Sequence, residues 1–109
     1  MKQQNYGRIV SVAARSGLKG DAMVAPYAVS KGGVILLTQT TAEEVKDYDI
    51  TANAVLPSIV DTPANRESMA TSDFAAWVAP EDLVAVMLFL ASERARAVTG
   101  AAIPVYNRA

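Results

Sequence analysis

The chain has 109 residues, with 10 Lys and Arg against 11 Asp and Glu, a formal net charge of −1, and neither His nor Cys. These absences exclude a disulfide framework, a thiolate nucleophile, a zinc–thiolate cluster and a Ser-His-Asp triad. The near-neutral charge gives no electrostatic basis for binding nucleic acid or an anionic membrane. The length predicts a single domain over residues 1–109.

Hydrophobic periodicity and the positions of Gly and Pro predict alternating strands and helices. The predicted elements are a strand over 8–13, a loop over 15–25, a helix over 26–48, a strand over 50–55, a loop with one or two short helices over 58–77, a helix over 79–91 and a strand over 101–106. This order favours an α/β fold, in which right-handed crossovers build a layer of about three parallel strands with flanking helices.

Three features of these elements carry further expectations. Gly32 and Gly33 lie inside the predicted helix, where each costs about 1 kcal/mol relative to Ala, so we expect a neighbouring helix or strand to approach closely. Pro104 predicts an edge position or a strand end, because proline cannot donate a ladder hydrogen bond. The long 58–77 connection is typical of a functional or mobile segment.

Tyr27 and Lys31 are the first candidates for chemistry. Their spacing of four residues places both side chains on one face of the predicted helix. An ammonium group beside a phenol favours the ionised form, which gives a group able to donate and accept a proton. The same spacing also occurs by chance, and a pair of surface residues without function is the simpler reading of the pair alone.

Five motifs follow one another along the chain, and they change that reading. They are Gly7-Arg8-Ile9-Val10, Tyr27-Ala28-Val29-Ser30-Lys31, Asn53-Ala54-Val55, Asp61-Thr62-Pro63 and Val98-Thr99-Gly100. Together they resemble the C-terminal half of the short-chain dehydrogenase/reductase family, in particular its 3-oxoacyl-(acyl carrier protein) reductases. The resemblance covers nearly all of the chain and implies a partial Rossmann-like layer from an NAD(P)-dependent oxidoreductase.

The resemblance implies roles for individual residues. Tyr27 resembles the catalytic acid/base that exchanges a proton with the substrate. Lys31 resembles the lysine that binds the nicotinamide ribose and favours ionisation of the tyrosine. Thr62, with the backbone of Ile59 and Val60, resembles the segment that contacts the nicotinamide carboxamide.

Two further matches concern the frame of the site. The 58–77 stretch resembles the mobile region that covers the substrate. Asn53 resembles a structural residue of the second strand, and the simplest role for it is a buried amide bonded to the backbone.

The sequence departs from the family pattern at two positions of the expected site. The catalytic serine of the family lies thirteen residues before the tyrosine, and Ala14 occupies that position here. Ser11 and Ser16 flank it: Ser11 should lie on the strand and point elsewhere, and Ser16 would serve only after a rearrangement of the loop. Loss of one positioned donor lowers turnover by roughly 10²–10³. Ser58 replaces a family glycine and should tighten the nicotinamide pocket.

The third departure concerns the cofactor. Glycine occurs only at positions 7, 17, 20, 32, 33 and 100, so the chain contains no glycine-rich dinucleotide fingerprint. That loop and the helix behind it normally hold the pyrophosphate. We therefore expect the N-terminal dinucleotide half to be missing, and NAD(P) binding by this chain to be weak or absent.

These departures set the functional expectation. We expect a truncated family member that does not catalyse as an isolated chain. The alternative is an active subunit or fragment whose cofactor-binding half is supplied in trans or upstream. We expect no metal site, since Glu43-Glu44 and Glu81-Asp82 are typical of solvated helix faces.

Partners and location follow from the same comparison. The strand over 8–13 should be a bare sheet edge, and the helix over 26–48 resembles the helix through which the family oligomerises. We expect a homo-oligomer that covers both, with no nucleic acid and no membrane as partners. Residues 1–6 lack the apolar core of a secretory signal, so cytoplasm is the expected compartment.

Overall fold

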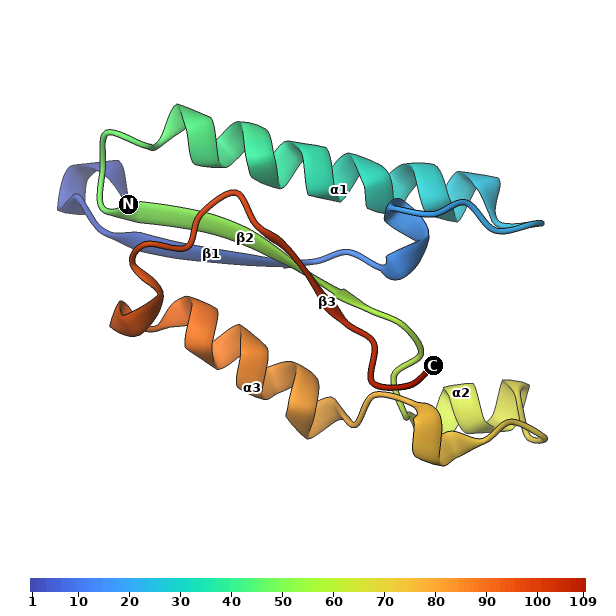
Figure 1. Ribbon diagram of the computed structural model, residues 1–109. Coiled ribbons are helices and arrows are strands. Elements are labelled where there is room, and N and C mark those ends of the chain that lie inside the picture. The colour runs from blue at the N-terminus through green and yellow to red at the C-terminus, as the bar shows by residue number, and fades with distance from the viewer.

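The computed structural model describes residues 1–109 and shows a parallel sheet between helices (Figure 1). The strands are β1 (Gly7–Val12), β2 (Ile50–Pro57) and β3 (Ala102–Val105), and the helices are α1 (Ala25–Glu44), α2 (Pro63–Ser68) and α3 (Pro80–Ala91). Single 3-10 turns lie at Lys2–Gln4, Arg15–Gly17, Phe74–Ala76 and Glu93–Ala95. The predicted α/β class with three parallel strands is confirmed.

The first long helix ends earlier than predicted, at Glu44 rather than near residue 48. Val45 already leaves the helical region of backbone space, with φ −113° and ψ 9°. The amide of Tyr48 then donates to the carbonyl of Val45, 2.9 Å away, which closes a turn instead of another helical repeat. The chain needs this turn because β2 begins at Ile50.

The two long helices cover opposite faces of the sheet, as Figure 1 shows. In β2, Ala54 and Leu56 pack with Ile35 of α1, whereas Val55 packs with Leu83 and Leu90 of α3. The strand order is β1-β2-β3, and both pairings are parallel.

The connection from β1 to β2 runs over the face covered by α1, and the connection from β2 to β3 runs over the face covered by α3. Both move one strand in the same direction across the parallel sheet, so the two crossovers have opposite handedness. The prediction that both crossovers are right-handed is therefore wrong for one of them. The rule applies to a helix that packs directly back from a strand. Between β2 and α3 the chain instead makes a long excursion through α2, which carries it to the other face.

Strand β2 is the centre of the molecule, and seven of its eight positions are apolar or carry only a hydroxyl. The exception is Asn53, which is completely buried. Its Nδ2 donates to the carbonyl of Val98 at 2.8 Å, and its Oδ1 accepts from the amide of Ala101 at 3.0 Å. This confirms the expected buried amide, which ties β2 to the segment that leads into β3.

The glycine pair in α1 has two different environments. A Cβ on Gly32 would lie 3.3 Å from the carbonyl oxygen of Gly17, and a Cβ on Gly17 would lie 2.8 Å from the backbone of Lys31. A Cβ on Gly33 would meet nothing within 4 Å. The close approach is therefore made by the Arg15–Gly17 turn, not by a helix or strand, and only Gly32 needs it.

The two outer strands are both edges within this chain, because β1 and β3 pair only with β2. Pro104 lies in β3, so the prediction of an edge position is confirmed. None of the helices combines the length and apolar character that a bilayer-spanning segment requires.

Candidate functional site

A cavity of about 360 Å³ opens where β1 and β2 end, which is the edge at which open parallel sheets bind ligands. We call it the Tyr27 cavity. Its lining residues are Ala14, Arg15, Ser16, Val24, Tyr27, Pro57, Ser58, Ile59 and Met69. They come from the turn after β1, the start of α1, the end of β2 and the segment after α2.

Tyr27 and Lys31 lie together on α1, as their spacing predicts. The Lys31 Nζ atom is 5.7 Å from the centre of the Tyr27 ring. The same Nζ donates to the carbonyl oxygen of Val12 at 3.4 Å, so it lies beside the last residue of β1. About half of the Tyr27 surface is exposed, which leaves the phenol accessible from the cavity.

The position of the family serine offers no hydrogen-bond donor. Ala14 is buried, lines the Tyr27 cavity and contributes only a methyl group. Ser16 lines the same cavity from the 3-10 turn, and its hydroxyl makes no hydrogen bond within the chain. Ser11 lies in β1 and is absent from the lining. The only uncommitted hydroxyl near Tyr27 on this side therefore belongs to Ser16.

The two residues that follow Ser58, Ile59 and Val60, have bonded carbonyl groups and free amides. Ile59 lines the Tyr27 cavity, and Val60 follows it directly. Their carbonyl groups accept hydrogen bonds, from the amide of Val78 at 2.9 Å and from Nδ2 of Asn65 at 2.8 Å. Their own amides donate to nothing in the chain. Two unused N–H donors thus lie beside the cavity.

Thr62 lies at the N-terminus of α2, next to the Tyr27 cavity but not in its lining. Its Oγ1 accepts from the amide of Asn65 at 3.2 Å and caps the N-terminus of α2. It lines a neighbouring polar hollow together with Asp61, Arg66 and Glu81, not the Tyr27 cavity. The structure therefore brings Ile59 to Tyr27 and leaves Thr62 outside this lining.

Asp61 and Arg66 form an ion pair next to Thr62. Arg66 Nε and Nη2 donate to the two carboxylate oxygens of Asp61 at 2.6 and 2.8 Å. These hydrogen bonds lower the pKa of Asp61 and raise that of Arg66. The pair holds the entry into α2 across its first turn.

Ser58 replaces the glycine of the family pattern without leaving its hydroxyl free. Its Oγ donates to the carbonyl of Tyr106 at 2.8 Å, so the side chain joins the end of β2 to the segment after β3. Ser58 still lines the Tyr27 cavity. Compared with glycine, Ser58 therefore adds a side chain to the cavity lining and a hydrogen bond to Tyr106.

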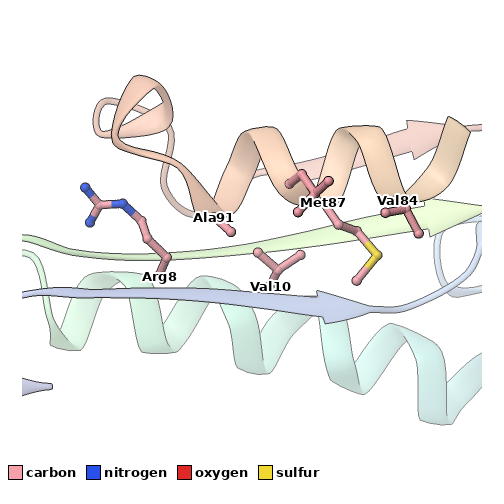
Figure 2. A pocket seen from close by; sticks show the side chains of 6 residues that line it. Arg8, Val10, Val84, Met87 and Ala91 are labelled. Carbon is pink, nitrogen blue, oxygen red and sulfur yellow. The ribbon is translucent and has the colours of Figure 1, made fainter. Parts of the chain in front are cut away.

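A second hollow, of about 390 Å³, lies between β1 and α3 (Figure 2). We call it the α3 groove. Its lining residues are Arg8, Val10, Val84, Met87, Leu88 and Ala91. The Arg8 side chain is only 3% exposed, and its Nη2 atom has no hydrogen-bond partner, although a Glu93 oxygen lies 3.9 Å away.

The surroundings of Arg8 explain why a buried cation is tolerated there. Its Nη1 atom donates to the carbonyl of Gly7 at 2.9 Å and contacts the Asp49 carboxylate at 3.1 Å. Its guanidinium lies 4.6 Å from the centre of the Tyr6 ring. The Glu93 carboxylate beside Tyr6 raises the pKa of that phenol. Sequence reasoning missed this cluster, since its members lie far apart in the chain.

The sequence profile of the family described as enoyl-(acyl carrier protein) reductase matches residues 1–106. The chain belongs to the short-chain dehydrogenase/reductase family. It is 39% identical to the 7alpha-hydroxysteroid dehydrogenase of Bacteroides fragilis, over 96% of this chain and 44% of that protein. The family assignment confirms the resemblance that the motifs indicate.

Solved structures of the family superpose on this fold. One is a 3-oxoacyl-(acyl carrier protein) reductase from Brucella melitensis with bound NAD, with a TM-score of 0.82, 28% identity and coverage of 97% of this chain and 42% of the other. Another is ElxO with bound NADP, with a TM-score of 0.89, 26% identity and coverage of 98% and 48%. The chain spans about half the length of the relatives it matches.

The residues present fit one end of such a dinucleotide. The unused amides of Ile59 and Val60, together with the Lys31 ammonium, suit a carboxamide and a ribose. The three helices begin directly after Val24, Thr62 and Ala79. None of them follows a glycine-rich turn. The glycine-rich turn that holds a pyrophosphate in dinucleotide-binding folds is thus not among the residues of this short-chain dehydrogenase/reductase chain.

Proposed function

We propose that this chain carries the proton-transfer half of an NAD(P)-dependent oxidoreductase site and does not catalyse turnover on its own. The observation that carries the proposal is the Tyr27 cavity. Tyr27, Ser16 and Ile59 all line it, and the Lys31 ammonium lies beside Tyr27. Hydride transfer would require a cofactor-binding half, which precedes this stretch in one polypeptide or comes from another chain.

The chemistry assigned to the chain is a proton transfer. When bound, the nicotinamide would supply or accept the hydride at the carbon of a carbonyl or hydroxyl group. In the reducing direction, the Tyr27 hydroxyl gives its proton to the carbonyl oxygen as that oxygen gains charge. Lys31, held beside the last carbonyl of β1, places its positive charge near the phenol and stabilises the resulting phenolate.

The weak point of this site is the second donor to the carbonyl oxygen. Ala14 cannot polarise the substrate, and the nearest free hydroxyl on the lining is that of Ser16. Removing one positioned donor lowers turnover by roughly 10²–10³. Ala14→Ser should therefore raise any turnover by about that factor, provided that the rest of the site is assembled as described.

The proposal is tested by separating binding from turnover. NADH or NADPH fluorescence is titrated with the chain alone, where we expect no saturable change up to millimolar cofactor. Reductase activity is then assayed after adding the separately produced first half of a family member. Tyr27→Phe should abolish the activity of the mixture, and Tyr48→Phe, which alters a tyrosine outside the cavity, should not.

Two outcomes would overturn the proposal. Tight cofactor binding by the chain alone would show that no second half is needed. Activity of the mixture that survives Tyr27→Phe would remove Tyr27 from the reaction.

We propose in addition that copies of the chain associate through the outer face of α1 and the edge of β1. Val29, Gly33, Leu36 and Leu37 recur at helical spacing, and the three apolar side chains are 63–75% exposed. Such a stripe marks a protein–protein contact. Light scattering at micromolar concentration should show an oligomer, which Leu37→Glu weakens and Lys46→Glu, in the exposed turn after the helix, does not. A monodisperse monomer would contradict this.

A further inference from the structure

We propose that Arg15 makes the Tyr27 cavity selective for carbonyl or hydroxyl substrates that also carry a carboxylate. The inference rests on the proposed function, because it names the substrate class for that site. It starts from the composition of the lining, in which Arg15 is the only charged residue among nine. In a pocket with few polar groups, the charged one fixes the orientation and the selectivity of the ligand.

Arg15 is held in place rather than extended into solvent. Its Nη1 atom donates to the main-chain oxygen of Ala109 at 2.7 Å. Its guanidinium lies 5.5 Å from the centre of the Tyr106 ring, and Ser58 in turn donates to the carbonyl of Tyr106. The cation is therefore fixed against the same wall that closes the cavity beside the end of β2.

No acidic side chain pairs with Arg15; its one hydrogen-bond partner is a main-chain oxygen of Ala109, the last residue of the printed chain, where that oxygen belongs to a carboxylate. The ion pairs of the chain involve Arg8, Lys46 and Arg66, and none includes Arg15. Its hydrogen bond to Ala109 uses one of the five N–H donors of a guanidinium. The remaining N–H donors of this planar cation can bind a second carboxylate, through two parallel hydrogen bonds.

The remaining lining is suited to the other end of such a substrate. Tyr27 and Ser16 offer hydroxyl groups for a carbonyl oxygen, and Val24, Ile59 and Met69 offer apolar contact for the carbons between. The volume of about 360 Å³ lies near the lower end of the range for ligand pockets, in keeping with a small oxo or hydroxy acid.

The test compares two ligands that differ only in charge, acetoacetate and its neutral analogue acetoacetamide. Each is titrated into the full ¹⁵N-labelled chain at constant ionic strength, and binding is followed by NMR shifts of the lining residues. We expect saturable shifts with acetoacetate, and an affinity at least about tenfold lower in Arg15→Gln, since hydrogen bonds to charged groups are the stronger class. Acetoacetamide should bind equally to both proteins.

Matched variants separate recognition from folding. Arg15→Lys keeps the charge and should recover part of the acetoacetate affinity, whereas a purely structural arginine would show no such dependence on ligand charge. Arg96→Gln removes an exposed cation outside the lining and should change nothing. Thermal unfolding of each variant checks that the fold is retained.

The possible results distinguish this inference from the proposed function. Equal affinity for the two ligands, undiminished acetoacetate binding by Arg15→Gln, or no binding of either ligand would overturn the role of Arg15. If both ligands bind equally and both weaken in Tyr27→Phe, the carbonyl site stands without the anion site. If acetoacetate depends on Arg15 but neither ligand senses Tyr27→Phe, the anion site stands and the proposed proton transfer fails.

Discussion

The Tyr27 cavity and the α3 groove are hollows of similar size in one small fold, about 360 and 390 Å³, but their linings differ. The cavity gathers hydroxyl groups, a cation and unused amides from four segments. The groove has five apolar side chains and Arg8, whose guanidinium already contacts Gly7 and Asp49. The first has several uncommitted hydrogen-bonding groups for a ligand, whereas the second is apolar except for Arg8, of which only Nη2 lacks a partner.

The difference follows from where the backbone ends and where it continues. Strands β1 and β2 both stop at the cavity, so loops with free polar groups meet there. The groove runs alongside β1, where the backbone is regular and side chains alternate between the two faces. Ligand chemistry and packing surface are thus separated by the geometry of one sheet.

The largest expected effect tests whether the α3 groove is open. Leu90 of α3 is completely buried, and Leu88, two residues earlier, lines the groove and is 66% exposed. Leu90→Ala should lower the free energy of unfolding by about 2–5 kcal/mol, and Leu88→Ala by less than about 0.5 kcal/mol. Urea denaturation measures both. A comparable loss for Leu88→Ala would mean that the groove is filled in solution.

The next effect concerns the frame behind the cavity. Asn53→Ala would leave the carbonyl of Val98 and the amide of Ala101 without their buried partners. We expect a loss of about 1–3 kcal/mol of unfolding free energy. Ser68→Ala, which removes an exposed hydroxyl, is the control. If Asn53→Ala unfolds like the wild type, water or a shifted backbone replaces the amide, and β3 is held by its ladder alone.

Substitutions in the glycine pair of α1, Gly32 and Gly33, should have a smaller effect on stability, and one of them should be stabilising. Gly33→Ala should stabilise the chain by about 1 kcal/mol, because alanine favours the helix and its Cβ meets nothing. Gly32→Ala should gain less or lose stability, since its Cβ would press on the carbonyl of Gly17. Thermal unfolding of both variants decides the matter. A destabilising Gly33→Ala that also lowers the oligomer mass would mean that the two copies approach each other too closely at Gly33 to admit a methyl group.

Much of the fold was predictable from the sequence because its signals are local. The β-branched stretches around Ile9 and Val55, and the prolines that open α2 and α3, identify the elements within a few residues. The end of α1 was not predictable to the residue, since the need to reach β2 overrides helical periodicity. The predicted right-handed crossover between β2 and β3 was wrong for a similar reason. The right-handed rule holds for short strand–helix–strand connections, and this connection is long and passes through α2.

The site divides along the same line. Tyr27 and Lys31 lie on one helix, so their spacing alone places them together. Arg15 gives no such signal, because its partner Ala109 is 94 positions away and only the fold joins them. For Thr62 the motif match predicts a cofactor contact, and the structure adds a second role, because its hydroxyl also caps α2.

The smallest expected effect concerns the Asp61–Arg66 pair, which borders the cavity segment without lining it. Arg66 lowers the pKa of Asp61, so the stabilisation from this pair is present above the usual carboxyl pKa and is lost as the pH falls through the lowered value. Both side chains are partly exposed, so the stabilisation is small and weakens with salt. Arg66→Gln should move the Asp61 titration to higher pH in a ¹³C-carboxyl NMR experiment, and Arg94→Gln should not. If Asp61 titrates alike in all three proteins, the two hydrogen bonds do not persist in solution, and the Thr62 cap alone fixes the start of α2.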